Sequence, residues 1–235
     1  MKTDFLTIQK LFVENELDLS KEQYESLEIY RKFLVEYNEN VNLTAITEPG
    51  EIWKKHFLDS IYPLKLVEIP VNSTLIDIGT GAGFPSVPMA IYRNDINITM
   101  LDSLQKRIFF LQQLAVKTGL SNWKCIHGRA EDMGKDEAYR EKYDVAVARA
   151  VAALPVLCEY CLPFVKIGGM FLALKGPNES SSDAEKAVSE LGGSIENEMC
   201  YDLCGDERKL IVIRKISQTP TKYPRRSKRI EQFPL

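Results

Sequence analysis

The chain has 235 residues, of which 45% are hydrophobic and 27% charged, and its formal net charge is −3. This composition is ordinary for a globular domain and excludes a disordered or fibrous chain. No apolar run approaches the ~20 residues that span a bilayer. Residues 1–4 also lack the apolar stretch of a signal peptide, so we expect a cytoplasmic monomer with no membrane segment.

Residues 1–62 are predicted to form a helical extension packed on the core. Apolar and aromatic residues recur at helical spacing from Tyr24 to Tyr37, after a start signal of Ser20 with Gln23 three residues later. Shorter helices are predicted over residues 5–12 and 49–61. We interpret their aromatic stripes as faces that pack on the core rather than as a platform for stacking bases.

Residues 63–216 are predicted to form the core, because strand and helix patterns alternate there. The expected strands are 74–78, 96–101, 123–126, 143–148, 169–174, 195–201 and 208–214, and the expected helices lie near 85–92, 104–118, 152–162 and 180–191. Such alternation predicts an α/β fold in which a mostly parallel, seven-stranded sheet carries helices on both faces, as in Rossmann-like domains.

A glycine-rich turn follows the first predicted strand, with Asp77 in the strand and Gly79, Gly81 and Gly83 after it. A dinucleotide-binding loop has a third glycine at the position that Phe84 occupies here, and a P-loop needs a lysine that this turn lacks. The loop therefore suits an adenosine without phosphates, and S-adenosylmethionine (SAM) is the common cofactor of that kind. A tight turn without a ligand is the alternative.

Several polar residues follow the predicted strands at their carboxyl ends, where open α/β sheets bind ligands. Asp77 should accept hydrogen bonds from the cofactor's ammonium group or from the loop amides, or else only stabilise the turn. Asp102 should bind the ribose hydroxyls, or cap the helix that follows. Ala130 and Glu131 would flank the adenine, although Glu131 also fits a solvated acidic turn.

Arg149 and Lys175 are the cations at the ends of the fourth and fifth strands. The sequence around Arg149 lacks the Asn-Pro-Pro-Tyr pattern of enzymes that methylate exocyclic amines. We expect Arg149 to bind the cofactor carboxylate, a guanine O6 atom or a phosphate, and Lys175 to bind a phosphate or to be merely solvated. Of the two histidines, His127 is expected to be structural, and His56 to be structural or to position a ligand.

The cysteines do not predict a disulfide framework, because their number is odd and no secretion signal precedes them. Cys158 and Cys161 could form a zinc tetrad with Cys200 and Cys204. However, the first two lie in an apolar, helix-like stretch, where cysteine usually packs as a small hydrophobic residue. We therefore expect no metal site.

Residues 217–235 are predicted to be an irregular, proline-containing basic tail. Acidic residues dominate residues 1–62, whereas cations cluster near the C-terminal end. A local basic cluster favours contact with an anion such as RNA, and a solubilising appendage is the alternative. The candidate RNA-binding residues are Lys222, Arg225, Arg226, Lys228 and Arg229.

Seven segments of the chain together resemble one family of enzymes. The segments are 56–60, 77–85, 101–103, 106–107, 129–131, 148–150 and 174–176. They are similar to the bacterial small-subunit ribosomal RNA guanine-N7 methyltransferases, once called glucose-inhibited division protein B. The resemblance covers roughly residues 5–215, and residues 226–231 depart from the family's pattern.

The resemblance implies a SAM-dependent enzyme that methylates N7 of a guanine in the 530 loop of 16S ribosomal RNA. It also implies that Gly79, Phe84, Ala130, Glu131 and Arg149 contact the cofactor. The alternatives are a SAM enzyme that acts on another RNA, a protein or a small molecule, a NAD-dependent oxidoreductase, and a non-catalytic RNA-binding module.

Overall fold

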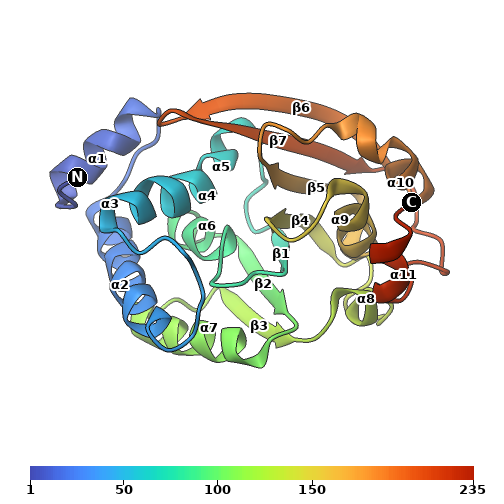
Figure 1. The fold of residues 1–235 in the computed structure, drawn as a ribbon, viewed down its shortest axis with the longest axis horizontal. Coiled ribbons are helices and arrows are strands. Elements are labelled where there is room, and N and C mark those ends of the chain that lie inside the picture. Colours follow the sequence, from blue (N-terminus) through green and yellow to red (C-terminus); the bar gives the residue numbers. More distant parts are fainter.

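Seven strands form a single sheet in the order β3-β2-β1-β4-β5-β7-β6 in this computed structural model, which describes residues 1–235 (Figure 1). The strands are β1 (Thr74–Ile78), β2 (Asn97–Asp102), β3 (Trp123–His127), β4 (Tyr143–Arg149), β5 (Val165–Lys175), β6 (Gly193–Leu203) and β7 (Asp206–Lys215). β1 to β5 are parallel, and β7 is antiparallel to both β5 and β6. The predicted fold class is therefore confirmed. Strand order reverses between β1 and β4, which places a ligand crevice at their carboxyl ends.

Helices cover both faces of the sheet, and one apolar cluster lies between the sheet and the helices on each face. One cluster includes α2 (Lys21–Asn38), α6 (Ser86–Tyr92) and α7 (Gln105–Thr118), and the other includes α9 (Leu154–Cys161) and α10 (Glu185–Glu190). Successive strand residues point to opposite faces, so Leu75 joins the first cluster and Ile76 the second. None of the helices is both long enough and apolar enough to cross a membrane.

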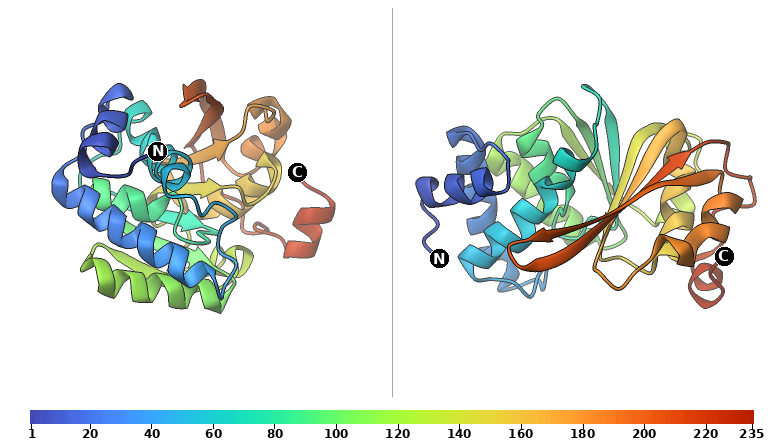
Figure 2. Two further views of the ribbon diagram at one scale, coloured as in Figure 1. Left: turned by 60° about the vertical axis from the view of Figure 1, so that its left-hand side comes forward. Right: turned by 90° about the horizontal axis from the view of Figure 1, so that it is seen from above.

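The N-terminal helices pack directly on the first face of the sheet (Figure 2). Beyond α1 (Phe5–Glu14), α2 begins with the predicted capping box, in which Ser20 and Gln23 bond to each other's backbone. Tyr30 then donates a 2.5 Å hydrogen bond from its hydroxyl to the carbonyl of Ala82 in the glycine-rich turn. The helical segment therefore helps to hold the loop that follows β1.

The helix predicted over residues 49–61 is divided by a π-helical turn. Its parts are α3 (Pro49–Ile52), the π-helical η1 (Trp53–Leu58) and α4 (Asp59–Ile61), and α5 (Pro63–Leu66) follows. A π-helical turn inserts an extra residue and reorients the side chains after it, often at functional sites. Here it carries His56 and leads directly into Asp59.

Two further elements differ from their predicted bounds. β5 begins at Val165 rather than at Gly169, because the Gly168-Gly169 pair lies at a bulge where the register with β4 shifts. The helix expected over residues 180–191 is a 3₁₀ turn, η3 (Ser181–Ala184), followed by the short α10. A second 3₁₀ turn, η2 (Leu162–Phe164), connects α9 to β5.

The C-terminal segment is folded against the sheet domain and is not the irregular tail that we expected. It contains α11 (Ser227–Gln232), and Tyr223 and Ile230 are buried in the second apolar cluster. Arg140 donates hydrogen bonds to the carbonyls of Thr219 and Tyr223. Apolar burial and backbone contacts thus fix a segment whose prolines and charges suggested irregular structure.

Candidate functional site

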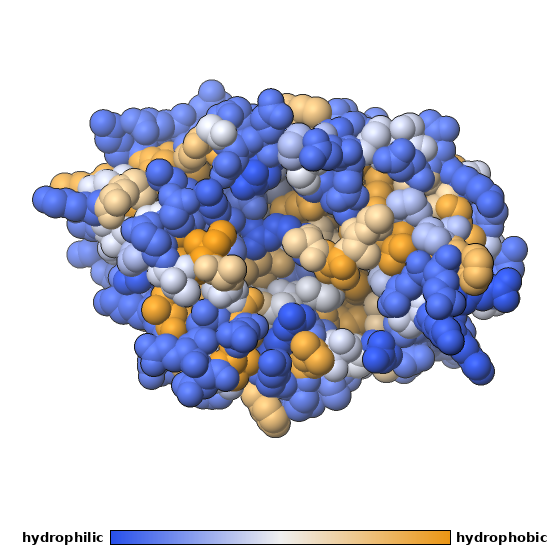
Figure 3. All heavy atoms as spheres, in the orientation of Figure 1, coloured by the Kyte–Doolittle hydropathy of each residue, from blue (hydrophilic) through white to orange (hydrophobic).

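A cleft of about 510 Å³ opens at the carboxyl ends of β1, β2 and β4. The space-filling view shows a hollow near the middle of this face, in which apolar and hydrophilic residues meet (Figure 3). Its walls come from the glycine-rich turn (79–82), the end of β2 (101–103), residues 128–131 around α8 (Ala130–Met133) and residues 149–151 after β4. These are the segments in which the sequence predicted a cofactor site.

The glycine-rich turn presents bare backbone to the cleft. Gly79 and Gly81 have φ values of +71° and +62°, a region that residues with a Cβ rarely adopt. A Cβ added to Gly81 would meet no protein atom closer than the Gly79 carbonyl oxygen at 3.9 Å. Because Gly81 lines the cleft, that free space is available to a ligand.

Asp102 connects the end of β2 to this turn. Its Oδ2 atom accepts hydrogen bonds from the Gly81 amide at 2.9 Å and from Arg107 at 3.1 Å, and its Oδ1 atom accepts one from the Leu104 amide at 2.9 Å. The last contact lies before α7, but the N-cap of this helix is Leu104 and no side chain caps it, so the alternative capping role of Asp102 is not seen. The carboxylate also lines the cleft, and its remaining lone pairs can accept hydroxyl donors.

Asp77 lies beneath the turn rather than in the cleft, and it does not contact the loop amides as we expected. It is fully buried, and its Oδ2 atom accepts hydrogen bonds from Thr80 at 2.7 Å and from Ser86 at 2.6 Å. Its Oδ1 atom is buried without a partner. Burial raises the pKa of Asp77 to about 7, against which the two hydroxyl groups act only in part.

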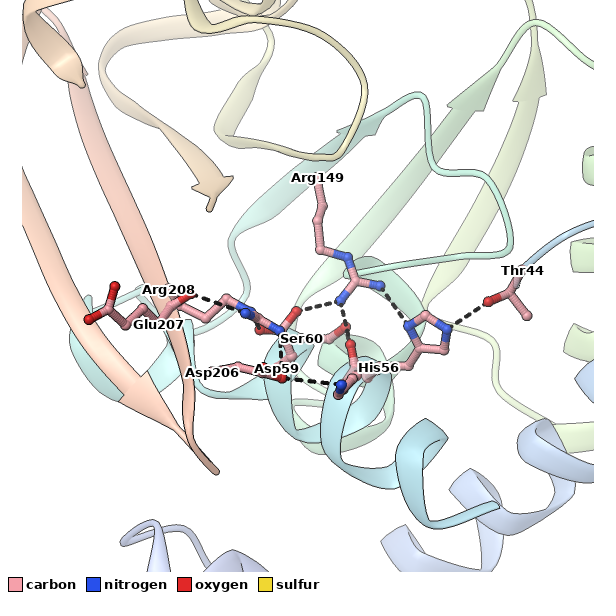
Figure 4. Close-up of polar contacts among 9 residues, drawn as sticks. Thr44, His56, Asp59, Ser60, Arg149, Asp206, Glu207 and Arg208 are labelled. Atoms are coloured by element: carbon pink, nitrogen blue, oxygen red, sulfur yellow. Dashed lines mark hydrogen bonds and ion pairs between the residues drawn. The ribbon is translucent and has the colours of Figure 1, made fainter. Parts of the chain in front are cut away.

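Phe84, His56 and Arg149 form a stack at the other end of the cleft. The ring centroids of His56 and Phe84 are 4.3 Å apart, and the Arg149 guanidinium lies 4.9 Å from the Phe84 ring centroid. Arg149 also pairs with Asp59 at 2.8 Å (Figure 4). Asp59 in turn accepts a 2.8 Å hydrogen bond from Arg208 of β7. The buried Asp59 therefore holds Arg149 from outside the cleft, a role that the sequence did not indicate.

His56 is neutral at physiological pH. Its Nδ1 atom is 3.5 Å from Arg149, which can only donate, so Nε2 carries the proton and donates to Thr44 at 2.8 Å. Burial, together with the Arg149 charge, lowers the pKa of His56 to about 3. Both ring nitrogens are thus engaged by the protein itself, which fits a positioning role.

The adenine end that we predicted from Ala130 and Glu131 has an additional wall. Tyr160 of α9 and Ser227 and Glu231 of α11 also line the cleft. Ser227 donates a 2.8 Å hydrogen bond to Glu231, and the Tyr160 hydroxyl lies 3.3 Å from both side chains. Sequence reasoning missed these residues, because no local pattern relates α11 to residues that precede it by so much of the chain.

Lys175 lies outside this cleft and is not the solvated cation or free phosphate ligand that we considered. Its ammonium group is buried, bonds to the carbonyl of Ala152 and pairs with Glu179 at 2.8 Å. The cysteines considered for zinc are dispersed, since Cys158 and Cys161 are buried in α9, whereas Cys200 and Cys204 are exposed near the end of β6.

Four of the five cations considered for RNA binding are exposed on the folded C-terminal segment: Lys222, Arg226, Lys228 and Arg229. Arg225 is the exception, because its guanidinium pairs at 2.6 Å with the buried carboxylate of Glu159. Removing one partner of such a pair leaves a buried charge uncompensated. Arg225 therefore anchors the segment to α9 and is withdrawn from the candidate RNA-binding residues.

The residues of the cleft fit SAM. Open backbone at Gly81 accepts the body of the ligand, and Asp102 offers carboxylate oxygens where a ribose diol would lie. The cationic Arg149 suits the carboxylate of the methionine moiety, and Ala130 and Glu131 lie at the opposite end of the cleft.

Comparisons with known proteins agree with this geometry. The family model described as rRNA small subunit methyltransferase G matches residues 23–211. A protein of Desulforamulus reducens named "Ribosomal RNA small subunit methyltransferase G" is 48% identical over 226 residues, 94% of each chain. One of the same name from Clostridium botulinum strain Eklund 17B is 49% identical over 228 residues, 93% of each chain.

Solved structures share the fold at low sequence identity. A SAM-dependent methyltransferase from Aquifex aeolicus superposes with a TM-score of 0.54 and 15% identity, covering 71% of this chain and 93% of that one. TYW2 from P. horikoshii, solved in complex with MeSAdo, has a TM-score of 0.53 and 14% identity, with coverage of 68% and 62%.

Proposed function

Since this chain belongs to the rRNA small subunit methyltransferase G family, we propose that it transfers a methyl group from SAM to N7 of a guanine in the 530 loop of 16S ribosomal RNA. The observation that carries the proposal is the cleft itself, which the glycine-rich turn, Asp102 and Arg149 line together. Family membership favours this function over the oxidoreductase and the non-catalytic module.

The protein's main contribution to this reaction is positioning. SAM supplies a methyl group on a sulfonium that is already activated, and guanine N7 attacks with a lone pair and carries no proton. No side chain therefore has to remove a proton, and the enzyme gains rate by aligning its two substrates. The neutral His56, with both ring nitrogens engaged, fits such a mechanism.

We assign Arg149 to the carboxylate of the cofactor's methionine moiety. Asp59 offsets part of its charge and, with His56 and Phe84, sets the direction of the guanidinium. An arginine fixed in this way binds a carboxylate with little loss of side-chain entropy. Asp102 and the Gly81 backbone would hold the ribose side, and Ala130 and Glu131 the adenine side.

The exposed cations of the C-terminal segment are the proposed contacts to RNA phosphates. Lys222, Arg226, Lys228 and Arg229 lie on a segment that also lines the cofactor cleft through Ser227 and Glu231. RNA held there would lie beside the reaction site. The same proposal includes action as a monomer in the cytoplasm.

Methyl transfer from labelled SAM to small-subunit ribosomal RNA tests the proposal. We expect the label in a single guanine of the 530 loop, where cleavage specific for 7-methylguanine should break the RNA. Label in a different nucleotide, or at an exocyclic amine, would overturn the assignment of the target. Transfer only to small molecules or proteins would overturn the RNA substrate altogether.

A further inference from the structure

A second cavity of about 490 Å³ adjoins the cofactor cleft, a size typical of pockets for small organic ligands. The two spaces share Arg149, Ala150 and Val151, the residues that follow β4. The second cavity is also lined by Lys175 at the end of β5, by Gly176 and Glu179 after it, and by Asp59 and Arg208. A molecule in this cavity would lie next to the cofactor, along the residues that the two spaces share.

The backbone of the shared wall is strained. Ala150 has a φ value of +55°, in the left-handed region that alanine rarely adopts. Non-glycine residues held in this conformation concentrate at functional sites, because the surrounding structure must compensate for the strain. The turn after β4 is therefore held in one shape between the cofactor cleft and the second cavity, both of which Arg149 lines.

Glu179 is the carboxylate of the second cavity that keeps one oxygen without a contact, because both oxygens of Asp59, the other carboxylate that lines it, pair with Arg149 and Arg208. Its Oε2 atom forms an ion pair with Lys175 at 2.8 Å and accepts a hydrogen bond from the Leu154 amide at 3.2 Å. The ion pair with the buried Lys175 fixes the carboxylate in place. The Oε1 atom receives neither contact, and it belongs to a partly exposed side chain that lines the cavity.

This arrangement matches one nucleobase better than the others. The Watson–Crick edge of guanine presents two adjacent donors, N1–H and N2–H, whereas adenine and cytosine present a ring-nitrogen acceptor that a carboxylate repels. Uracil offers one donor between two carbonyl oxygens. N7 of guanine lies on the opposite edge of the purine from N2. A guanine whose N1–H and N2–H face Glu179 therefore directs N7 toward the shared wall and the cofactor.

We propose that the second cavity receives the acceptor guanine, turned out of the RNA stack, and that Glu179 reads its Watson–Crick edge. The proposal rests on the proposed methyltransferase function and adds the residue that selects the base. Enzymes that modify bases commonly extrude them and read the freed edge in this way. Glu179 then acts as a specificity residue and takes no part in forming the new bond.

The test replaces the target guanosine by inosine, which keeps N1–H, O6 and N7 but lacks the 2-amino group. The target is first located by mapping the methylated nucleotide in small-subunit RNA. We expect the wild-type protein to methylate guanosine with a kcat/KM at least roughly 10-fold above that for inosine, because one hydrogen bond to a charged group is lost. Equal rates on both RNAs would overturn the proposal, yet leave the methyltransferase function standing.

The second part of the experiment uses the variant Glu179→Gln. Its amide can keep the contacts to Lys175 and Leu154 but then turns a donor toward the base. We expect kcat/KM for guanosine to fall roughly 100-fold and the ratio of guanosine to inosine to shrink to within about 3-fold. SAM affinity, measured by calorimetry, should be unchanged.

Glu185→Gln is the matched control, because Glu185 is exposed on α10 and lines neither cavity. It should retain wild-type rates and the wild-type ratio. If Glu179→Gln slows both RNAs equally and keeps the wild-type ratio, Glu179 is structural and the proposal fails. Absence of methyl transfer by the wild-type protein to any guanosine would instead refute the proposed function.

Discussion

Asp77, the buried carboxyl group beneath the glycine-rich turn, should make the stability of the folded protein depend on pH. Its pKa is raised to about 7 by burial, while Thr80 and Ser86 donate to only one of its oxygens. A carboxyl whose pKa rises on folding stabilises the folded state when protonated. Its contribution is therefore full below 3.8, the ordinary pKa of an aspartate side chain, and is lost as the pH rises through about 7.

Asp77→Asn should remove this pH dependence, because the amide does not titrate but can still accept from the two hydroxyl groups. A pKa shift from 3.8 to about 7 corresponds to a contribution of up to about 4 kcal/mol. Urea denaturation of both proteins without cofactor measures it. The free energy of unfolding of the variant, relative to wild type, should rise between pH 4 and 7 and level off above. A constant difference over this range would show that Asp77 titrates normally.

Gly81 is the residue at which we expect the backbone to contact the cofactor. In Gly81→Ala the new Cβ occupies space that the structure leaves to a ligand, so SAM affinity should fall by at least roughly 10-fold. Gly119→Ala is the matched control, because Gly119 has a similar φ of +67°, has no neighbour within 4 Å and lies at the end of α7. Both variants should lose similar stability, and calorimetry should show weaker SAM binding only for Gly81→Ala. Equal SAM affinity in the two would contradict the placement of the ligand.

For single residues, the sequence predicted the site residues that lie at or just after the ends of strands. It missed those that distant parts of the chain bring to the site. Asp102, Arg149 and Glu131 line the cleft because the carboxyl ends of parallel strands meet at one edge. The roles of Asp59 and Glu231 depend on contacts with distant strands and helices, and the spacing of residues along the sequence does not predict such contacts.

Among the elements, α11 is the one that adds an unpredicted wall to the cleft. Its residues Ser227 and Glu231 bond to each other and approach Tyr160 at the cleft. The preceding residues are held by the Arg225–Glu159 pair and by Arg140. A segment interpreted from its sequence as an RNA-binding tail thus also lines the cleft in which we propose that SAM binds.

Removal of residues 227–235 should weaken SAM binding by roughly 10-fold, because a polar wall of the cleft is lost. The truncated chain keeps Arg225 and its ion pair, so the sheet domain should stay folded. The double variant Lys228→Ala/Arg229→Ala is the control, since it keeps Ser227 and Glu231. Calorimetry should show near wild-type SAM affinity for the control. Unchanged affinity in the truncated protein would mean that α11 covers the cleft without contacting the cofactor.

The elements that the sequence predicted well are those with strong hydrophobic periodicity. All seven strands, α2 and α7 lie within a few residues of their expected bounds. α11 was missed because the short helix buries only Ile230 among charged residues and follows several prolines. The π-helical η1 was missed because one inserted residue leaves the apolar spacing of residues 49–61 nearly helical.

For binding of RNA by the molecule as a whole, the distribution of charge matters more than the net charge of −3. The N-terminal helices and the C-terminal segment lie at opposite ends of the fold (Figure 2). Exposed cations at the C-terminal end can therefore attract RNA phosphates locally, although the molecule is acidic overall.

The double variant Lys228→Ala/Arg229→Ala should bind small-subunit RNA more weakly, most visibly at low salt. Each phosphate contact that is lost lowers the slope of log affinity against log salt by roughly 0.7 to 0.9. Filter binding over a salt series measures this slope. Lys10→Ala/Lys21→Ala, in exposed residues at the other end of the molecule, should keep the wild-type slope. An identical slope in all three proteins would place the RNA contacts elsewhere.

The position of α11 in the chain also determines when the cofactor site is completed. A ribosome synthesises a protein from its N-terminus, and domains begin to fold as they emerge. A nascent chain made through Lys215 already contains all seven strands, yet it lacks Ser227 and Glu231. Full affinity for SAM therefore arises only after the sheet has been made and α11 has left the exit tunnel. A protein fused behind Leu235 should obstruct that final step more than the same protein fused ahead of Met1.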